Sequence, residues 1–250
     1  MSETILFVFE GERTEVQVFR SLERHFLRNS NIKIVTFKTH IYSLYKKIKE
    51  DDLSEFLEIV DVLKEDSRTE SALENLSSED ISQVFLFFDH DGHVPEARNE
   101  NLLELLNHFN EETGNGKLFI SYPMVEALKH VPVDRSIFQA LCVDIVDEEP
   151  NTSNYKGLAH CEGDRCFRDF TNLSYESWKC LLAEHCKKAN FIVYDQFVLP
   201  STSVPTQVGI FKNELEKHIR PRKQVAVLSG FPLYLAEYFG IAWLTDLLQE

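Results

Sequence analysis

Two short apolar segments, each followed by acidic residues, stand out in the pattern of hydrophobic and polar positions. Residues 5–9 and 84–88 are continuous runs of β-branched, leucine and phenylalanine side chains. Such short runs are typical of strands that are buried on both faces of a sheet. Glu-Gly follows the first run at residues 10–11, and Asp-His-Asp-Gly follows the second at residues 89–92. The pattern therefore predicts two buried strands with carboxylates at their carboxyl ends.

The rest of the first 160 residues alternates between helical and strand-like patterns. Apolar residues recur every three or four positions over residues 13–28 and 101–109, which predicts two helices. Residues 32–37 and 117–121 are typical of further strands. Strands that alternate with helices indicate a parallel sheet flanked by helices, which is an α/β fold.

The pattern beyond residue 131 is mostly helical, with one further strand predicted over residues 225–229. We expect residues 1–160 to form the α/β domain and residues 161–250 to form a mostly helical portion packed on it. The helices predicted in this portion cover residues 175–189, 208–218 and 232–248.

An acidic insertion is predicted near residues 50–80, which contain 12 acidic residues and two basic ones. Residues 50–66 are predicted to form an amphipathic helix and residues 67–80 a polar linker. In one interpretation the apolar face of this helix packs on the sheet. In the other, its acidic face docks on a basic partner protein or imitates nucleic acid. The apolar residues that share one face of this helix are Leu53, Phe56, Leu57, Val60 and Leu63.

The net charge of −15 excludes an independent, non-specific DNA-binding protein. The first 150 residues carry 15 lysines and arginines against 30 acidic residues, whereas the last 100 carry 11 of each. A surface with this balance repels phosphate over long distances. A metal site, a local basic face or a partner protein therefore has to supply the attraction to any nucleic acid.

The chain shows no sign of export or of a membrane span, so we expect a cytoplasmic protein. It begins Met-Ser-Glu-Thr and lacks the basic segment and cleavage site of a signal peptide. No apolar run reaches the roughly 18 residues that a span requires. Five cysteines in such a chain favour free thiols over disulfides. A structural zinc site is the less favoured alternative for His160, Cys161, Cys166, Cys180, His185 and Cys186.

The acidic residues at the strand ends are candidates for a metal site. Ligands gather at the carboxyl ends of the strands in open parallel sheets, so Glu10 meets Asp89 and Asp91 there if their strands are neighbours. Oxygen ligands favour Mg²⁺ or Mn²⁺ over zinc, and Gly92 permits the turn that lets both aspartates face one ion. The alternative is that residues 89–92 form an ordinary turn at the end of a strand.

Several motifs together resemble the Toprim domain of topoisomerases, bacterial primases and nucleases of the OLD class. These motifs are Glu10-Gly11, Thr14-Glu15 and the Asp-His-Asp-Gly segment. Residues 121–128, Ser-Tyr-Pro-Met-Val-Glu-Ala-Leu, followed by Tyr155-Lys156, look more narrowly like the small Toprim effectors of phage defence, the RloB-like proteins and the PARIS effector. The resemblance covers residues 4–160.

This resemblance implies a catalytic and metal-binding role for the acidic residues. It makes Glu10 a metal ligand or general base supported by Glu15, and it makes Asp89 and Asp91 ligands of one or two Mg²⁺ or Mn²⁺ ions. Glu126 is a further ligand in this view, with the alternative of an exposed glutamate at the start of a helix. Lys129 and Lys156 are candidates for holding the scissile phosphate, with solvated lysines as the alternative.

Other residues near the motifs or in the helical portion have weaker predicted roles. His90 and His93 flank the acidic segment and are interpreted as structural or solvent-facing, with proton transfer as the alternative. A basic cluster in the last hundred residues is the best candidate for a contact with the nucleic-acid backbone, although a solvated charged turn is the more favoured interpretation. The nucleic-acid-binding candidates in this cluster are Arg220, Arg222 and Lys223.

The predicted function is that of a metal-dependent nuclease that acts as a toxic effector in antiviral defence. The resemblance implies control by a partner ABC-type ATPase. The chain has no P-loop motif of its own, so any nucleotide-dependent switch is expected on another subunit. Homodimer formation is also considered. DNA and RNA both remain open as substrates, and the PARIS resemblance favours tRNA. Two alternatives are a non-catalytic regulatory subunit and another metal-assisted phosphoesterase.

Overall fold

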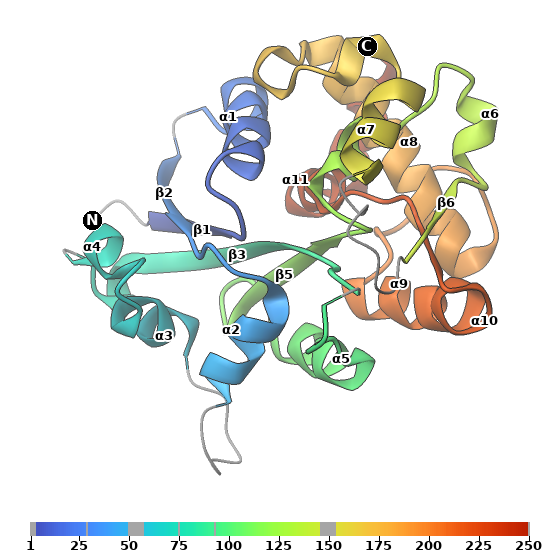
Figure 1. Ribbon diagram of the computed structural model, residues 1–250. Coiled ribbons are helices and arrows are strands. Elements are labelled where there is room, and N and C mark those ends of the chain that lie inside the picture. Colours follow the sequence, from blue (N-terminus) through green and yellow to red (C-terminus); the bar gives the residue numbers. More distant parts are fainter. Residues whose placement is uncertain are drawn as a thin grey trace.

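The computed structural model describes residues 4–28, 30–49, 58–74, 76–92, 94–145 and 154–249 (Figure 1). Within these ranges the chain forms an α/β fold with a mostly parallel five-stranded sheet of order β2-β1-β3-β5-β4 and a second, two-stranded sheet, β6-β7. This confirms the predicted fold class at the level of a parallel sheet flanked by helices with a helical C-terminal part. The strands are β1 (Thr4–Phe9), β2 (Asn31–Thr36), β3 (Ile81–Asp89), β4 (Asn110–Glu111), β5 (Gly116–Ser121), β6 (Cys142–Asp144) and β7 (Gln224–Ala226).

The helices account for most of the remaining described chain. The α-helices are α1 (Thr14–Phe26), α2 (Ile41–Ile48), α3 (Ile59–Glu65), α4 (Glu70–Leu73), α5 (Asn99–His108), α6 (Arg135–Phe138), α7 (Asn154–Glu162), α8 (Tyr175–Tyr194), α9 (Gln207–Glu214), α10 (Arg220–Arg222) and α11 (Gly230–Gln249). Short 3₁₀ helices are η1 (Ser78–Asp80), η2 (Val125–Lys129), η3 (Arg165–Phe167) and η4 (Phe170–Asn172), and η5 (Leu215–Ile219) is a π-helix.

The two strands that precede the acidic residues are neighbours in the sheet. All six residues of β1 are buried, and β1 pairs in parallel with β3 so that Phe9 lies opposite Phe87. The Glu10 N–H continues this pairing by donating to the Phe87 carbonyl, with an N···O distance of 3.1 Å. The register therefore brings the end of β1 beside the end of β3, as the sequence analysis requires for a shared site.

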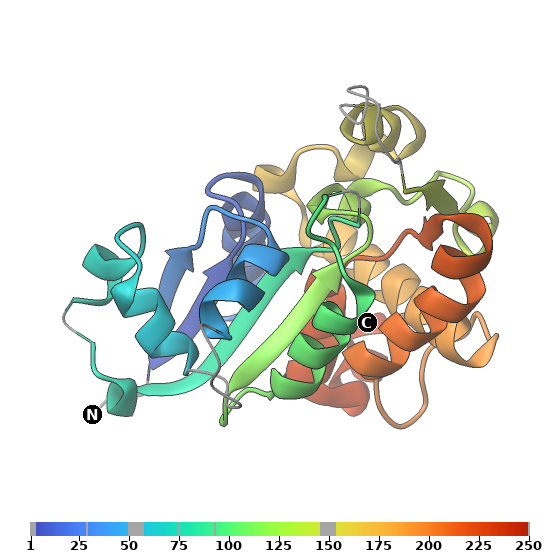
Figure 2. The ribbon, with the colours of Figure 1, turned by 60° about the horizontal axis from the view of Figure 1, so that its bottom comes forward.

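Helices cover both faces of the sheet (Figures 1 and 2). On the face of α1 and α11, the ring of Tyr234 lies edge-on to Phe7, Phe87 and Phe119, which come from the three central strands. The helices α2 and α5 cover the opposite face. One buried hydrophobic cluster runs from β1 to α11. The division at residue 160 stays a prediction, and the core continues across it.

The C-terminal strand is shorter than predicted and belongs to a separate small sheet. Of the predicted residues 225–229, only Val225 and Ala226 are in β7, which pairs in antiparallel fashion with β6. Leu228 instead bridges to Tyr122 just beyond β5, with backbone N···O distances of 2.7 and 3.0 Å. The segment after α10 is thereby attached to the carboxyl end of the central sheet.

The acidic insertion differs in part from its prediction. Residues 50–57, including the predicted Leu53, Phe56 and Leu57, lie outside the described residues. The described part of the predicted helix is α3, which buries Val60 and Leu63. The prediction of a linker over residues 67–80 was wrong in part, because α4 and η1 form there. Burial of Leu73 and a capping box between Ser77 and Asp80 stabilise these short turns.

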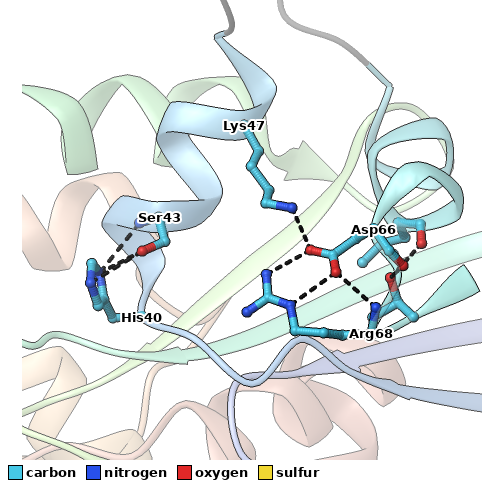
Figure 3. A network of polar contacts seen from close by, with 7 residues as sticks. His40, Ser43, Lys47, Asp66 and Arg68 are labelled. Atoms are coloured by element: carbon cyan, nitrogen blue, oxygen red, sulfur yellow. Dashed lines mark hydrogen bonds and ion pairs between the residues drawn. The ribbon is translucent and has the colours of Figure 1, made fainter.

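A buried aspartate joins the acidic insertion to α2 (Figure 3). The Asp66 carboxylate accepts hydrogen bonds from Lys47 Nζ at 2.5 Å and from the Arg68 guanidinium at 2.6 and 2.9 Å. The Asp66 side chain is 2% exposed, so its charge is compensated by these two cations rather than by water. The Arg68 hydrogen bonds are the largest cause of a pKa of Asp66 well below its usual range.

Among the described residues, none of the helices is both long enough and apolar enough to cross a membrane.

Replacement of Asp66 by alanine is expected to lower the free energy of unfolding by about 1–3 kcal/mol, because Lys47 and Arg68 lose their shared acceptor. Urea denaturation measures this change. Asp61→Ala is the matched control, because Asp61 is exposed on α3 and its loss is expected to cost less than about 0.5 kcal/mol. Equal losses in the two variants would contradict the structural role of the network.

Candidate metal centre

A cleft of about 650 Å³ opens at the carboxyl ends of β1 and β3. It is lined by the loop between β1 and α1, the loop after β3, the start of η2 and the start of α7. The structure therefore brings together five of the residues that the sequence analysis assigned to the site, although they come from distant parts of the chain. These five residues are Glu10, Glu15, Asp89, Asp91 and Lys156.

Glu10 is the centre of the acidic group. Its Oε2 accepts a hydrogen bond from the Asp89 backbone N–H at 3.0 Å, which holds the Glu10 side chain across the end of β3. The carboxyl groups of Glu10 and Asp91 are also in close contact, and the charge of Asp91 contributes to a raised pKa of Glu10. Two carboxylates in such a contact repel each other, and a cation bound between them would relieve the repulsion.

The turn after β3 is made by a different residue from the one predicted. Asp91 has a φ of 44°, in the left-handed region, whereas Gly92 does not. The prediction that Gly92 makes the turn by its backbone conformation was therefore wrong. Gly92 is required for space, because a Cβ there would lie 2.6 Å from Cε1 of the buried His90 ring. A left-handed aspartate is a strained position of the kind that often marks functional sites.

Glu15 lies at the start of α1 and faces back toward β1. Its carboxylate accepts hydrogen bonds from the backbone N–H groups of Gly11 and of Glu15 itself, and the residue is buried. A Cβ on Gly11 would lie 2.4 Å from Oε2 of Glu15. Glu15 therefore shapes the loop that carries Glu10 as well as adding negative charge beside it.

Glu126 lies beside the cleft and is held by Lys156. The Lys156 ammonium is 3.4 Å from Glu126 Oε1, and the Glu126 side chain is 5% exposed. Glu126 Oε2 is buried without a hydrogen-bond partner among the described residues. The exposed-glutamate interpretation of Glu126 was wrong. The helix that carries it is the five-residue 3₁₀ helix η2, which places Glu126 in the interior.

Lys129 does not line the cleft. Its ammonium lies 5.3 Å from the centre of the Phe170 ring, and burial lowers the pKa of Lys129. Glu126 and Lys156 are close enough to influence that pKa. Of the two lysines predicted to contact phosphate, Lys156 is the one that reaches the cleft, with a side chain that is 62% exposed.

Burial of several like charges at one place raises the pKa values of the group. Desolvation, followed by the charge of Asp91, raises the pKa of Glu10 well above its usual range. Desolvation and the neighbouring charge of Glu10 do the same for Asp89. The pKa of Glu15 is also raised, mainly by burial. The structure thus holds more buried carboxylates here than its nearby cations neutralise.

The donor set fits a hard divalent cation such as Mg²⁺ or Mn²⁺. The carboxylates supply only oxygen ligands, and the unpartnered Oε2 of Glu126 is a buried acceptor without a donor. In the described part of the chain, however, no three histidine, cysteine, aspartate or glutamate side chains are already arranged as a set of metal ligands. A bound ion would therefore have to replace the contact between Glu10 and Asp91.

The predicted basic cluster is divided between two surfaces. Arg220 and Lys223 line a pocket of about 280 Å³ with His90 and Gly92, next to the metal centre. Arg222 instead lines a separate pocket of about 360 Å³. The three cations are close in sequence and were therefore predicted to act as one group. The turn of α10 instead places Arg222 on a different surface from Arg220 and Lys223.

A hydrogen-bonded chain next to the candidate metal centre, with the buried His130 in its middle, was missed by the sequence analysis. The Tyr155 hydroxyl is 3.2 Å from His130 Nδ1, and His130 Nε2 is 3.0 Å from Glu162 Oε2. The charges of Glu126 and Asp89 contribute to a pKa of Tyr155 well above its usual range, after the larger effect of burial. His130 is not part of any recognisable motif, so the sequence gives no signal for it. It is identified by its contact with Tyr155 in the folded protein.

Of the other histidines and cysteines singled out in the sequence, several are buried in the core, whereas Cys161 and Cys166 are exposed. His90 is buried, with its ring 5.3 Å from that of Tyr122, in agreement with the predicted structural role. His93 lies outside the described residues. The zinc alternative is not supported at His185, which accepts a hydrogen bond from the Ser229 N–H at 3.1 Å and has its other nitrogen 3.3 Å from the Leu128 carbonyl. Cys186 is fully buried in the core.

In comparisons with known proteins, the chain matches no protein-family model, no curated protein and no solved structure.

Mn²⁺ is expected to raise the melting temperature of the protein by several degrees at concentrations about 100-fold above its Kd, because it binds only the folded carboxylate group. Glu10→Gln and Asp89→Asn are expected to lose this shift. Differential scanning fluorimetry at fixed ionic strength measures it. Glu12→Gln is the matched control, because Glu12 is 58% exposed and paired with Lys38. An unchanged shift in Glu10→Gln would contradict the assignment.

The metal-free Glu10→Gln variant is expected to gain stability relative to the parent protein as the pH rises from about 4 toward 8. The raised pKa values of Glu10, Glu15 and Asp89 mean that the folded state holds protons more tightly than the unfolded chain, whose carboxyl pKa values are about 4. Their contribution to stability is complete below that pH and is lost as the pH rises through the raised values. Urea denaturation with chelator at several pH values tests this. A constant difference between the two proteins would contradict it.

Proposed function

We propose that this protein is a Mg²⁺- or Mn²⁺-dependent nuclease of the Toprim type. The observation that supports this most directly is the group of partly buried carboxylates from Glu10, Asp89 and Asp91 at the ends of two adjacent parallel strands. Buried carboxylates with raised pKa values in an open cleft are a recognised sign of a catalytic or metal site. The order of the motifs and the parallel sheet agree with the Toprim resemblance.

In this proposal, the residues of the cleft have different roles in phosphodiester hydrolysis. Glu10, Asp89 and Asp91 would hold the cation, with Glu126 as a further ligand. The bound cation would lower the pKa of water and stabilise charge on the phosphate oxygens. Lys156 lies near the start of α7, and most of its side chain is exposed. Its ammonium group is therefore suited to contact a phosphate oxygen. Glu15 keeps the loop of Glu10 in place.

The acidic surface implies that the substrate is attracted locally rather than at long range. Arg13 and Lys38 at the rim of the cleft, together with Lys156, are the basic residues that line it. A net charge of −15 keeps non-specific nucleic acid away from a toxic enzyme until a partner or a specific contact overcomes the repulsion. An ABC-type ATPase partner in antiviral defence, as the motifs imply, fits this arrangement, and a cytoplasmic location would follow.

Purified protein is expected to cleave at least one of labelled tRNA, single-stranded DNA and plasmid in the presence of Mn²⁺. Glu10→Gln and Asp89→Asn are expected to reduce the cleavage rate by about 100-fold or more, because they remove ligands of the catalytic ion. Glu12→Gln is the matched control and is expected to cleave at close to the parent rate. Gel electrophoresis of the products measures the rates.

Three outcomes would overturn the proposal. A protein that binds Mn²⁺ but cleaves none of these substrates, alone or with its partner ATPase, would be a regulatory subunit. Cleavage that persists in Glu10→Gln and Asp89→Asn would come from another site or from a contaminant. Hydrolysis of a small phosphate ester in the absence of nucleic-acid cleavage would instead identify a phosphoesterase.

A further inference from the structure

The turn of residues 89–92 lies between two cavities. Its alternate residues face different sides: Asp89 and Asp91 line the cleft of the candidate metal centre, whereas His90 and Gly92 line the pocket of about 280 Å³. We call the second cavity the Arg220 pocket. The remaining residues that line it are Ala97, Asn99, Ile145, Ile219, Arg220 and Lys223.

We propose that the Arg220 pocket binds one unpaired nucleotide of the substrate, next to the phosphate that is cut. This inference depends on the proposed nuclease function, and it adds the form of nucleic acid that the enzyme accepts. A nucleotide chain bound over the candidate metal centre can continue past the turn of residues 89–92, because this turn borders both cavities. The Arg220 pocket lies at that turn.

The cationic side of the pocket is suited to a phosphate. Arg220 is exposed and makes no hydrogen bond or ion pair with any described residue, so its guanidinium is available to a ligand. The backbone around it is fixed, because the Lys223 N–H donates to the Ile219 carbonyl at 2.9 Å and the Ile145 N–H donates to the Lys223 carbonyl at 2.8 Å. A guanidinium on a fixed backbone can bind a phosphate through two parallel hydrogen bonds.

The start of α5 adds polar groups on the other side of the pocket. Asn99 is the first residue of this ten-residue helix, and its N-cap residue, Arg98, makes no side-chain capping bond. The first N–H groups of the helix therefore lack a side-chain acceptor, and their partial positive charge favours an anion. The Asn99 amide carries both donors and an acceptor, which suits the edge of a base.

The size and the apolar walls select a single nucleotide rather than a duplex. Ala97, Ile145 and Ile219 supply the apolar surface against which the face of a base can pack. A volume of about 280 Å³ lies at the small end of the range of ligand pockets, roughly 300–1,000 Å³, so it admits one nucleoside and not a base pair. A base can enter such a pocket only when it is unpaired or flipped out of its helix.

The test compares oligonucleotides that differ only in pairing. One set is a hairpin with an unpaired loop, made as RNA and as DNA, and the other is the same sequence fully paired in a duplex. Binding is measured by fluorescence anisotropy in the Glu10→Gln background, so that cleavage does not interfere. Cleavage is measured separately in Mn²⁺ with Glu10 intact.

The variants are Arg220→Ala and Asn99→Ala, with Arg222→Ala as the matched control. Arg222 carries the same charge two residues away but lines a different pocket. We expect Arg220→Ala and Asn99→Ala to weaken hairpin binding by about tenfold or more, with a much smaller effect on the duplex. Arg222→Ala is expected to change hairpin binding by less than about threefold. Melting temperatures confirm that each variant is folded.

The outcomes separate this proposal from the proposed function. Hairpin binding that depends on Arg220 but not on Arg222, without cleavage, would support the pocket and overturn the nuclease. Cleavage with normal hairpin binding in Arg220→Ala and Asn99→Ala would overturn the pocket and leave the nuclease intact. Equal losses of hairpin binding in Arg220→Ala and Arg222→Ala would show general electrostatic attraction. Equal binding of hairpin and duplex would exclude selection of unpaired bases. Either result overturns the pocket proposal. A protein that neither binds nor cleaves any of the oligonucleotides would overturn both.

Discussion

The mutual repulsion of partly buried carboxylates at the ends of β1 and β3 is the interaction on which the candidate site depends. Parallel pairing of the two strands sets Phe9 opposite Phe87, and the residues that follow are consequently forced together. Without a cation, burial and the charge of Asp91 raise the pKa of Glu10, so that the folded protein favours the protonated form of this carboxyl group. A fold that concentrates negative charge in this way is less stable than one with neutral residues at the same place, and ion binding would relieve the repulsion.

The helical C-terminal part contributes to the sheet and to the site at the same time. Tyr234 of α11 packs against the aromatic residues of the central strands, and Leu228 is hydrogen-bonded to Tyr122 at the carboxyl edge of the sheet. These contacts place α10, and with it Arg220, beside the turn that carries the aspartates. Tertiary packing therefore brings Arg220 close to the acidic ends of β1 and β3.

The central strands and the acidic edge were predictable from the sequence because their signals are local. A run of apolar residues that ends in a carboxylate identifies both β1 and β3, and the motif order identified Glu126 and Lys156. Features that depend on packing were not predictable. The left-handed conformation of Asp91, the division between Arg220 and Arg222, and the buried position of His130 arise from contacts between distant segments, which leave no periodic pattern in the sequence.

The most direct test of the central claim is the position of a bound ion in crystals grown with Mn²⁺, located by its anomalous scattering. The account predicts a peak at about 2 Å from carboxylate oxygens of Glu10, Asp89 and Asp91, with the contact between Glu10 and Asp91 replaced by the ion. An acidic edge without a peak, at a Mn²⁺ concentration that supports cleavage or thermal stabilisation, would contradict it.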